Sequence, residues 1–173
     1  AWSCDILPTE IPGQHIQGDV LEHLGDGWDL MVAHPPCTDL AVSGAAWFKE
    51  KIADGRQQRA LEFVKALMEA PIKKICIENP VSVISSKIRK PDQIIQPWMF
   101  GDKAQKTTCL WLKNLPKLKA TEVVEPEWTV YKNTGKRVSK HHYDTLFLPK
   151  AERAKVRSLT FQGIADAMGS QWG

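Results

Sequence analysis

Four short apolar segments in the first half of the chain are each followed by a residue that could take part in chemistry. The four residues are Asp5, Asp19, Cys37 and Glu78, which come after residues 1–4, 14–16, 29–33 and 74–77. A thiol is a nucleophile once it is ionised, and a carboxyl group can exchange a proton or form hydrogen bonds with a substrate. The combination predicts covalent chemistry by Cys37 with Glu78 as its partner.

Cys37 lies in the turn Pro35-Pro36-Cys37, directly after an apolar run. Two prolines stiffen the turn, so the next side chain is presented in a fixed direction and is available as a thiolate nucleophile. The alternative is a small apolar residue that fills a tight turn, and Pro-Pro-Cys taken alone favours that alternative. Cys4, Cys76 and Cys109 lie within apolar runs and are expected to be packing residues.

The three carboxylates also have two interpretations each. Glu78 precedes Asn79-Pro80 and could be a general acid or hydrogen-bond donor, or else a capping or salt-bridge carboxylate. Asp5 and Asp19 could accept hydrogen bonds from a ribose and an adenine amino group, or could bond the backbone of their own turns.

The elements that position these residues alternate between short strands and helical segments, which is typical of a parallel α/β sheet. Residues 29–33 form the continuous apolar run expected of a parallel strand covered on both faces. Residues 56–69 have the apolar spacing of a helix. Because ligands bind outside the carboxyl ends of the strands in open α/β sheets, we expect the four residues to meet at one crevice.

The second half of the chain predicts fewer regular elements. Residues 82–99 are expected to form a polar, basic loop bounded by proline, and residues 107–112 a strand. The other expected elements are a hairpin within 123–138 that turns at Asn133-Thr134-Gly135, and helices over 150–157 and 163–172.

Length and composition predict one domain over residues 1–173, of which 43% are hydrophobic and 25% charged. No apolar run approaches the ~20 residues that cross a bilayer, and no secretory start is present, so a cytoplasmic protein without a membrane partner is expected. The four cysteines form no CxxC pair and His141-His142 lack a third ligand at sensible spacing, so no metal is expected.

Charge is distributed unevenly along the chain. Residues 1–30 contain six acids and no Lys or Arg, whereas residues 82–119 contain eight Lys or Arg and two Asp. Within the basic segment, phosphate contacts are expected from Ser85, Ser86, Lys87, Arg89 and Lys90. The alternative is that both segments are ordinary solvated faces, which charge alone favours.

The ordered set of motifs resembles the cytosine-5 DNA methyltransferase family, over essentially the whole chain. The motifs in order are Asp5, Gly18-Asp19, Pro35-Pro36-Cys37 and Glu78-Asn79. The resemblance is greatest to the small phage and prophage members, which share three further sequence motifs: His34-Pro35-Pro36-Cys37, Ile77-Glu78-Asn79-Pro80 and Gly163-Ile164-Ala165-Asp166-Ala167-Met168.

This resemblance implies a Rossmann-like, parallel-type sheet of the S-adenosyl-L-methionine-dependent methyltransferase class, with a small β-rich insertion before the C-terminal helices. It implies methylation of cytosine at C5 in DNA, in a bacterial or phage-infected cell, as in restriction–modification. Cys37 would attack C6 and Glu78 would contact N3, while Lys106 and Thr108 are the nearest equivalents of the family's paired arginines. The residues implied to bind the cofactor are Asp5, Ile6, Asp19, Val20 and Pro35.

The chain departs from the family pattern at several places. The first motif, a strand and Gly-rich turn under the methionine half of the cofactor, has no counterpart, so we expect the 173-residue chain to bind the cofactor poorly and to be inactive. Pro80 replaces the usual Val. The segment 82–140 stands in place of a full target-recognition domain.

Two alternative functions follow from these departures. One is the same chemistry on a cytosine nucleotide or a single-stranded nucleic acid, which activity on dCMP would reveal. The other is a non-catalytic nucleic-acid-binding relative, which would not bind S-adenosyl-L-methionine. The target sequence and the oligomeric state are not predicted.

Overall fold

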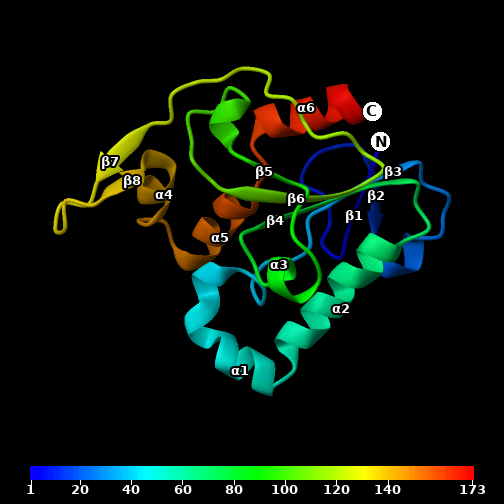
Figure 1. Ribbon diagram of the computed structural model, residues 1–173. Coiled ribbons are helices and arrows are strands. Elements are labelled where there is room, and N and C mark those ends of the chain that lie inside the picture. Colours follow the sequence, from blue (N-terminus) through cyan, green and yellow to red (C-terminus); the bar gives the residue numbers. More distant parts are fainter. The chain divides into compact units, whose positions relative to one another are not determined.

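The computed structural model describes residues 1–173. The chain packs as two compact units: unit 1 comprises Ala1–Asp92 and Leu110–Leu115, and unit 2 comprises Gln93–Cys109 and Pro116–Gly173 (Figure 1). The expectation that the whole chain acts as a single catalytic domain stays a prediction.

Unit 1 contains two parallel strand pairs, which confirms the α/β class. β1 (Trp2–Asp5) pairs with β2 (Gln14–Gln17), and β3 (Leu30–Ala33) pairs with β4 (Lys74–Pro80), both in parallel. β1 and β2 form a two-stranded sheet. β3 and β4 belong to a four-stranded sheet of order β3-β4-β6-β5, in which β6 is Thr108–Lys113 and β5 is Gln93–Ile95. The sheets are therefore small and only partly parallel.

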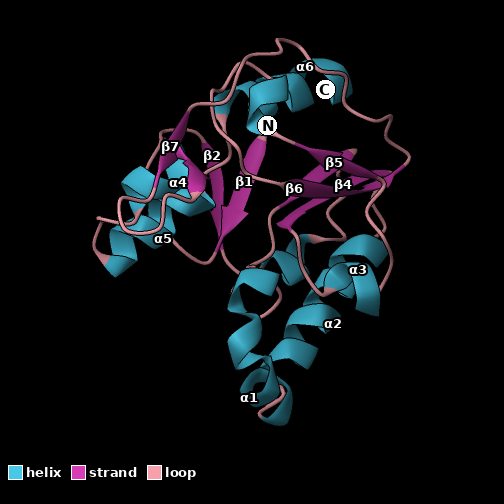
Figure 2. Ribbon diagram, turned by 60° about the vertical axis from the view of Figure 1, so that its left-hand side comes forward, coloured by secondary structure: helices cyan, strands magenta, loops and turns pink.

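Two helices between β3 and β4 form the crossover connection of unit 1. α1 (Phe48–Ala53) is followed by α2 (Arg56–Glu69), and the joint passes through Gly55, whose φ of 77° favours glycine. Figure 2 shows α2 below β4 and approaching α1 at its first residue. The boundaries of α2 are those predicted from periodicity. Its buried apolar residues, Leu61, Val64 and Leu67, recur every three positions and so lie on one face of the helix.

The interior of unit 1 is built on β4, and β3 is less buried than its sequence predicts. Ile75, Cys76 and Ile77 are buried, whereas all four residues of β3 are half-buried. The expectation that residues 29–33 are covered on both faces is therefore wrong. The physical reason is the strand order: β3 is an edge strand with one hydrogen-bonded neighbour.

β4 also extends further than the apolar run indicates. It continues through Glu78 and Asn79 to Pro80, although the sequence predicts an end at Ile77. Asn79 is 1% exposed, so a polar residue here occupies an interior position of the strand.

Residues 82–99 are not the loop that their polarity predicts. They contain α3 (Ile84–Lys87), β5 (Gln93–Ile95) and a 3-10 helix (Pro97–Met99). Ile84, Ile95 and Pro97 are fully buried and anchor these elements. Single apolar anchors separated by polar residues produce no periodicity, so the sequence does not reveal them.

Unit 2 contains the predicted hairpin. β7 (Trp128–Val130) pairs in antiparallel with β8 (Arg137–Ser139), and the turn between them has Gly135 at a φ of 66°. The backbone N–H of Gly135 donates to the carbonyl of Tyr131 at 2.8 Å. The turn position is confirmed, and the strands are shorter than residues 123–138 allow.

Three helices complete unit 2: α4 (Lys140–Thr145), α5 (Lys150–Ser158) and α6 (Gln162–Trp172). The last two confirm the predicted C-terminal helices, whereas α4 and the earlier α1 were not foreseen. α6 starts directly beside the 100–102 segment. The two backbones are so close that a side chain at Gly163 would overlap the carbonyl oxygen of Phe100, so a glycine is required there. β6 (Thr108–Lys113) is the predicted strand at 107–112 and contributes residues to both units.

Candidate active site

The parallel register of β3 and β4 brings the Cys37 turn beside Glu78. Ala33 is paired with Ile77, so the next residues along the two strands, His34 and Glu78, lie side by side. The Nδ1 atom of His34 is 2.9 Å from Oε2 of Glu78, a hydrogen bond between an imidazole and a carboxyl group. The side chain of Glu78 is 16% exposed and that of His34 is 42% exposed. The carboxyl group is therefore largely shielded from water, and one of its oxygens contacts the imidazole.

A second contact fixes the first proline of the turn to β4. The side-chain amide of Asn79 donates from Nδ2 to the carbonyl of Pro35 at 2.9 Å, and both residues are buried. The other amide atom, Oδ1, is buried without a hydrogen-bond partner. Asn79 therefore belongs to the site as the residue that holds the Pro35-Pro36 segment in place.

Cys37 is exposed and lies at the start of a tight turn. Its carbonyl oxygen accepts hydrogen bonds from the backbone N–H groups of Leu40 at 3.0 Å and Ala41 at 2.8 Å. The alternative expected from sequence, a buried cysteine that fills the turn, does not describe this residue. Its thiol is accessible to a substrate.

The chain segments that follow Cys37 and Glu78 are also joined to each other. The backbone N–H of Val42 donates to the carbonyl of Val81, and that of Val83 donates to Leu40, each at 3.0 Å. Ala41 and Ser82 form an antiparallel bridge between them. The segments that contain Cys37 and Glu78 are thus joined by hydrogen bonds both at Pro35, before Cys37, and after the two residues.

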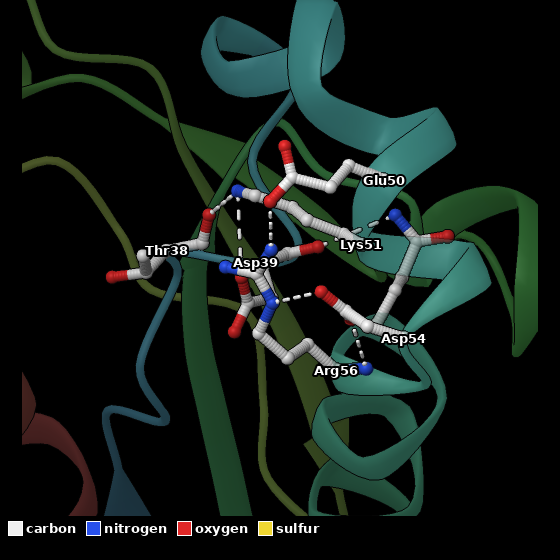
Figure 3. A network of polar contacts seen from close by, with 7 residues as sticks. Thr38, Asp39, Glu50, Lys51, Asp54 and Arg56 are labelled. Carbon is white, nitrogen blue, oxygen red and sulfur yellow. Dashed lines mark hydrogen bonds and ion pairs between the residues drawn. The ribbon is translucent and has the colours of Figure 1, made fainter.

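Lys51 of α1 holds the residues directly after Cys37 (Figure 3). Its ammonium group donates to the carbonyl of Thr38 and lies 3.4 Å from Oδ1 of Asp39. Lys51 is 7% exposed, which is unusual for a lysine and is accounted for by these two partners. Gln57 of α2 adds a hydrogen bond from Nε2 to the carbonyl of Asp39 at 3.3 Å.

The joint between α1 and α2 is fixed by Arg56, which Figure 3 shows between two carboxylates. Its guanidinium is 2.7 Å from Oδ2 of Asp54 and 2.6 Å from Oε1 of Glu50. The backbone N–H of Arg56 also donates to Asp54 and, with its guanidinium, lowers the pKa of that carboxyl group. This joint helps to place Lys51 against the turn.

Asp5 and Asp19 lie at the ends of the paired strands β1 and β2. Oδ1 of Asp5 accepts from the N–H of Leu7, and Oδ1 of Asp19 accepts from the N–H of Leu21, both at 2.9 Å. The backbone N–H of Gly18 donates to the carbonyl of Asp5 at 3.0 Å and joins the two strand ends. The turn bonds expected as an alternative are therefore present. They use one oxygen of each exposed carboxylate and leave the other without a partner.

The remaining residues predicted to contact a cofactor differ in accessibility. Ile6 is 72% exposed, Val20 is half-buried at the start of a 3-10 helix (Val20–His23), and Pro35 is buried. Ile6 and Val20 offer apolar surface next to the two carboxylates, whereas Pro35 has its carbonyl engaged by Asn79.

No protein-family model matches this chain, and no curated protein matches it. The chemistry of the site is therefore inferred from its own residues.

Lys106 and Thr108 belong to unit 2, whereas Cys37 and Glu78 belong to unit 1. The ammonium group of Lys106 donates to the carbonyls of Arg157 at 2.8 Å and Leu159 at 3.2 Å, at the end of α5. Thr108 is buried, and its hydroxyl donates to the carbonyl of Lys106. Both side chains thus have structural partners within unit 2, and their catalytic role stays a prediction.

The predicted phosphate-binding residues fall into two groups. Lys87 and Lys90 are exposed and have no polar partner. Arg89 donates to Oδ2 of Asp92 at 2.7 Å and to the carbonyl of Leu112 at 3.1 Å. Ser85 and Ser86 lie in α3, and the hydroxyl of Ser86 donates to the carbonyl of Val83.

Asp92 is the partner that commits Arg89 to the fold. Burial opposes ionisation of its carboxyl group, but the N–H of Leu112 and the guanidinium of Arg89 outweigh that effect and lower its pKa. A phosphate would compete with this carboxylate for Arg89. Lys87 and Lys90 are therefore the freer of the predicted contacts.

Three tryptophans whose rings could stack on bases differ in accessibility. Trp111 is 1% exposed, and its indole N–H donates to the carbonyl of Arg89, so it is a packing residue. Trp98 and Trp128 line a shallow hollow of about 440 Å³ in unit 2, where the guanidinium of Arg137 lies 4.2 Å from the ring centroid of Trp128. These two rings remain candidates for stacking.

His141 and His142 form no metal site. His141 packs edge-on against Phe161, and burial together with the charges of Lys106 and Arg157 lowers its pKa. No group of three or more His, Cys, Asp or Glu residues is arranged to hold a metal ion. No helix combines the length and the apolar character needed to cross a bilayer.

Proposed function

We propose that this protein methylates cytosine at C5 in DNA, with S-adenosyl-L-methionine as cofactor and a covalent bond between Cys37 and C6 as intermediate. The observation that carries the proposal is the exposed thiol of Cys37 in the turn that follows β3, a turn whose first residue, His34, contacts the half-buried carboxyl group of Glu78 on β4. The contacts from Asn79 and Lys51 support it, because they give the turn a single conformation.

In the proposed reaction, the Cys37 sulfur forms a bond to C6. The electron pair of the C5–C6 double bond then shifts to C4–C5, and the pair of the C4–N3 double bond moves to N3, which takes up a proton from Glu78. C5 becomes electron-rich and can accept a methyl group. As C5 accepts the methyl group, the electron pair on N3 re-forms the C4–N3 double bond, and N3 then returns its proton to Glu78. Water takes the proton from C5, the pair of that C–H bond re-forms the C5–C6 double bond, and the Cys37 thiolate leaves with the pair of the C6–S bond. One difficult substitution is thus divided into easier steps.

The residues at the ends of β1 and β2 fit one end of the proposed cofactor. Asp5 and Asp19 each have an unpartnered carboxylate oxygen at the carboxyl end of a parallel strand, which suits hydroxyl and amino donors of an adenosine. Ile6 and Val20 would cover its apolar faces. When bound, S-adenosyl-L-methionine would supply the methyl group that C5 accepts. A Rossmann-like methyltransferase fold is part of this proposal, supported by the two parallel strand pairs.

DNA is the proposed partner, with Lys87 and Lys90 in contact with phosphates. Both are exposed on the segment that follows Glu78, and neither is engaged by an acid. A cytosine in a duplex must leave the base stack before Cys37 can reach C6, at a cost of a few kcal/mol. An already unpaired cytosine avoids that cost.

Covalent trapping tests the proposal. Duplex oligonucleotides with 5-fluorocytosine in randomised flanking sequence are incubated with the full-length protein and S-adenosyl-L-methionine. Fluorine at C5 cannot leave as a proton does, so the adduct should persist as a complex that resists denaturation and carries the added methyl group by mass. Cys37→Ser should not trap, because serine is far less nucleophilic at neutral pH.

The matched control is Cys4→Ser, which changes a half-buried thiol of the same unit. It should trap like the unaltered protein. Equal trapping by Cys37→Ser would contradict the assignment of the nucleophile. Trapping on single-stranded DNA or fluorinated dCMP, but not on a duplex, would move the proposal to an unpaired substrate, and DNA binding without any trapping would indicate a non-catalytic protein.

A further inference from the structure

We infer that His34 is a positioning residue for Glu78, which orients its carboxyl group and stores the proton that Glu78 passes to N3 of cytosine. This inference deepens the proposed function and rests on it. His34 does not itself touch the reacting ring in this assignment, and it acts through Glu78.

The first support is geometric. His34 follows β3 directly and stands beside Glu78 in the parallel register, with Nδ1 and Oε2 2.9 Å apart. Pro35 and Pro36 follow His34, so the backbone leaving the histidine is stiff, and Pro35 is fixed by Asn79. The imidazole is thus held against one carboxyl oxygen, while the other oxygen, Oε1, has no hydrogen-bond partner and remains available to a substrate.

The second support is the proton balance of the proposed adduct. When the Cys37 thiol adds to the base, sulfur gives up one proton and N3 gains one, so no net proton enters or leaves the pair of protein and base. The proton leaves the Cys37 sulfur and arrives at N3, which are different atoms. A third group must therefore hold a proton between ionisation of the thiol and protonation of N3. An imidazole titrates in the neutral range and can do so, whereas a carboxylate alone is ionised there.

Three other titratable groups close to the site in the chain or in the strand are engaged differently. Asp39 and Lys51 are paired with each other beside the residues that follow Cys37. Cys76 lies on β4 two residues before Glu78, but burial first, and then the charges of Glu78 and Asp92, raise its pKa to about 12. The thiol of Cys76 therefore stays protonated throughout the neutral range.

The chain contains a matched control for this pair. His23 has its Nδ1 atom 2.9 Å from Oδ2 of Asp26, the same contact at the same distance, at the end of the 3-10 helix. The two pairs differ in that the carboxyl group of Asp26 is 48% exposed and that of Glu78 is 16% exposed. Loss of His23 should reproduce the general effects of removing a histidine–carboxylate pair.

The experiment measures exchange of the C5 hydrogen of cytosine with water, as tritium release from labelled DNA without cofactor. The adduct makes C5 electron-rich, so C5 can take a proton from water, lose the tritium and expel Cys37 again. His34→Asn retains an N–H donor for Glu78 but cannot store a proton. We expect it to slow exchange roughly 100-fold at neutral pH, the lower end of the range for general acid–base catalysis.

The pH profile separates proton storage from packing. The unaltered protein should show an exchange rate that declines on the alkaline side of neutrality, because an imidazole then no longer holds a proton to store. In His34→Asn the decline should disappear, although thermal unfolding should be unchanged. His34→Ala should lose more activity than His34→Asn, because Glu78 is then no longer oriented, and His23→Asn should behave as the unaltered protein.

A nitrogen NMR measurement distinguishes failure of this inference from failure of the proposed function. Glu78→Gln should shift the Nδ1 resonance of His34 and leave that of His23 in place. If that shift occurs and exchange is measurable, an unaltered pH profile in His34→Asn would overturn the inference and leave the proposed function standing. No exchange on duplex DNA, single-stranded DNA or dCMP by the unaltered protein would overturn both.

Discussion

Cys76 lies on β4 and Cys37 lies beyond the end of the neighbouring parallel strand β3, and the surroundings of the two thiols are opposite. Cys76 is within β4, paired in register with Val32, and is fully buried. Cys37 lies four residues after β3 ends and is exposed. Burial raises the pKa of the Cys76 thiol to about 12, with smaller contributions from the charges of Glu78 and Asp92. The same side chain is thus an apolar packing group in one strand and an accessible thiol just beyond the other.

The comparison teaches that position relative to the strand end decides what a cysteine can do here. Inside the strand, neighbours on both faces exclude water and oppose the thiolate. Beyond the strand end, the turn is held by polar contacts from three other elements, which leave the thiol itself open. The predictions below test this difference, from the largest effect to the smallest.

The largest expected effect is on thiol reactivity. Under native conditions, Cys37 should react with iodoacetamide at least about 100-fold faster than Cys76. The buried thiol of Cys76 becomes accessible to the reagent only when β4 unfolds transiently. Mass spectrometry of peptides from a time course measures both rates. In denaturant the two rates should converge, and a fast native reaction at Cys76 would break the comparison.

Next in size is the effect of Lys51, which supports the Cys37 turn from α1. Lys51→Met should destabilise the protein by about 2–4 kcal/mol, since it leaves the carbonyl of Thr38 without its donor and Asp39 without its cation. Denaturant unfolding measures this change. Lys49→Met, on the exposed side of the same helix, should cost less than about 0.5 kcal/mol.

Per pH unit, a smaller change in the free energy of unfolding is expected from ionisation of Cys76. The unfolded thiol ionises near its ordinary value of 9.0, whereas the folded thiol does so only at about 12. A raised folded pKa means that this contribution is complete below pH 9 and declines as pH rises toward 12, by up to about 1.4 kcal/mol per pH unit. Cys76→Val should remove this slope from unfolding curves measured between those values, and Cys37→Val should not.

The smallest effects concern exposed and engaged cations on the basic segment. Lys87→Ala and Lys90→Ala should each reduce the slope of log affinity for DNA against log salt by about 0.9, equally for all sequences. Arg89→Ala should change the slope less and should cost stability, because Arg89 already binds Asp92. Fluorescence titrations at several salt concentrations provide the slopes. An equal change for all three residues would show that Arg89 leaves Asp92 to bind phosphate.

Much of the local structure could be predicted from the sequence because local signals determine it. The spacing of Leu61, Val64 and Leu67 predicted α2 with its correct ends. The turn around Gly135 was predicted from residues that tolerate a positive φ. The apolar runs before Asp5, Asp19 and Cys37 located β1, β2 and β3 to within about two residues, a normal uncertainty for such boundaries.

The sequence also determined which residue types the site contains, namely an exposed-turn cysteine after two prolines and a carboxyl group at the end of the next apolar run. Only the tertiary structure decided how they are held. The pairing of His34 with Glu78 depends on the register of two strands that are forty residues apart in the chain, and the register is set by packing. The burial of Lys51 and the engagement of Arg89 by Asp92 likewise depend on partners that no spacing rule specifies. Periodicity reports which face of an element is apolar, but it carries no information about which polar side chain from another element will meet it.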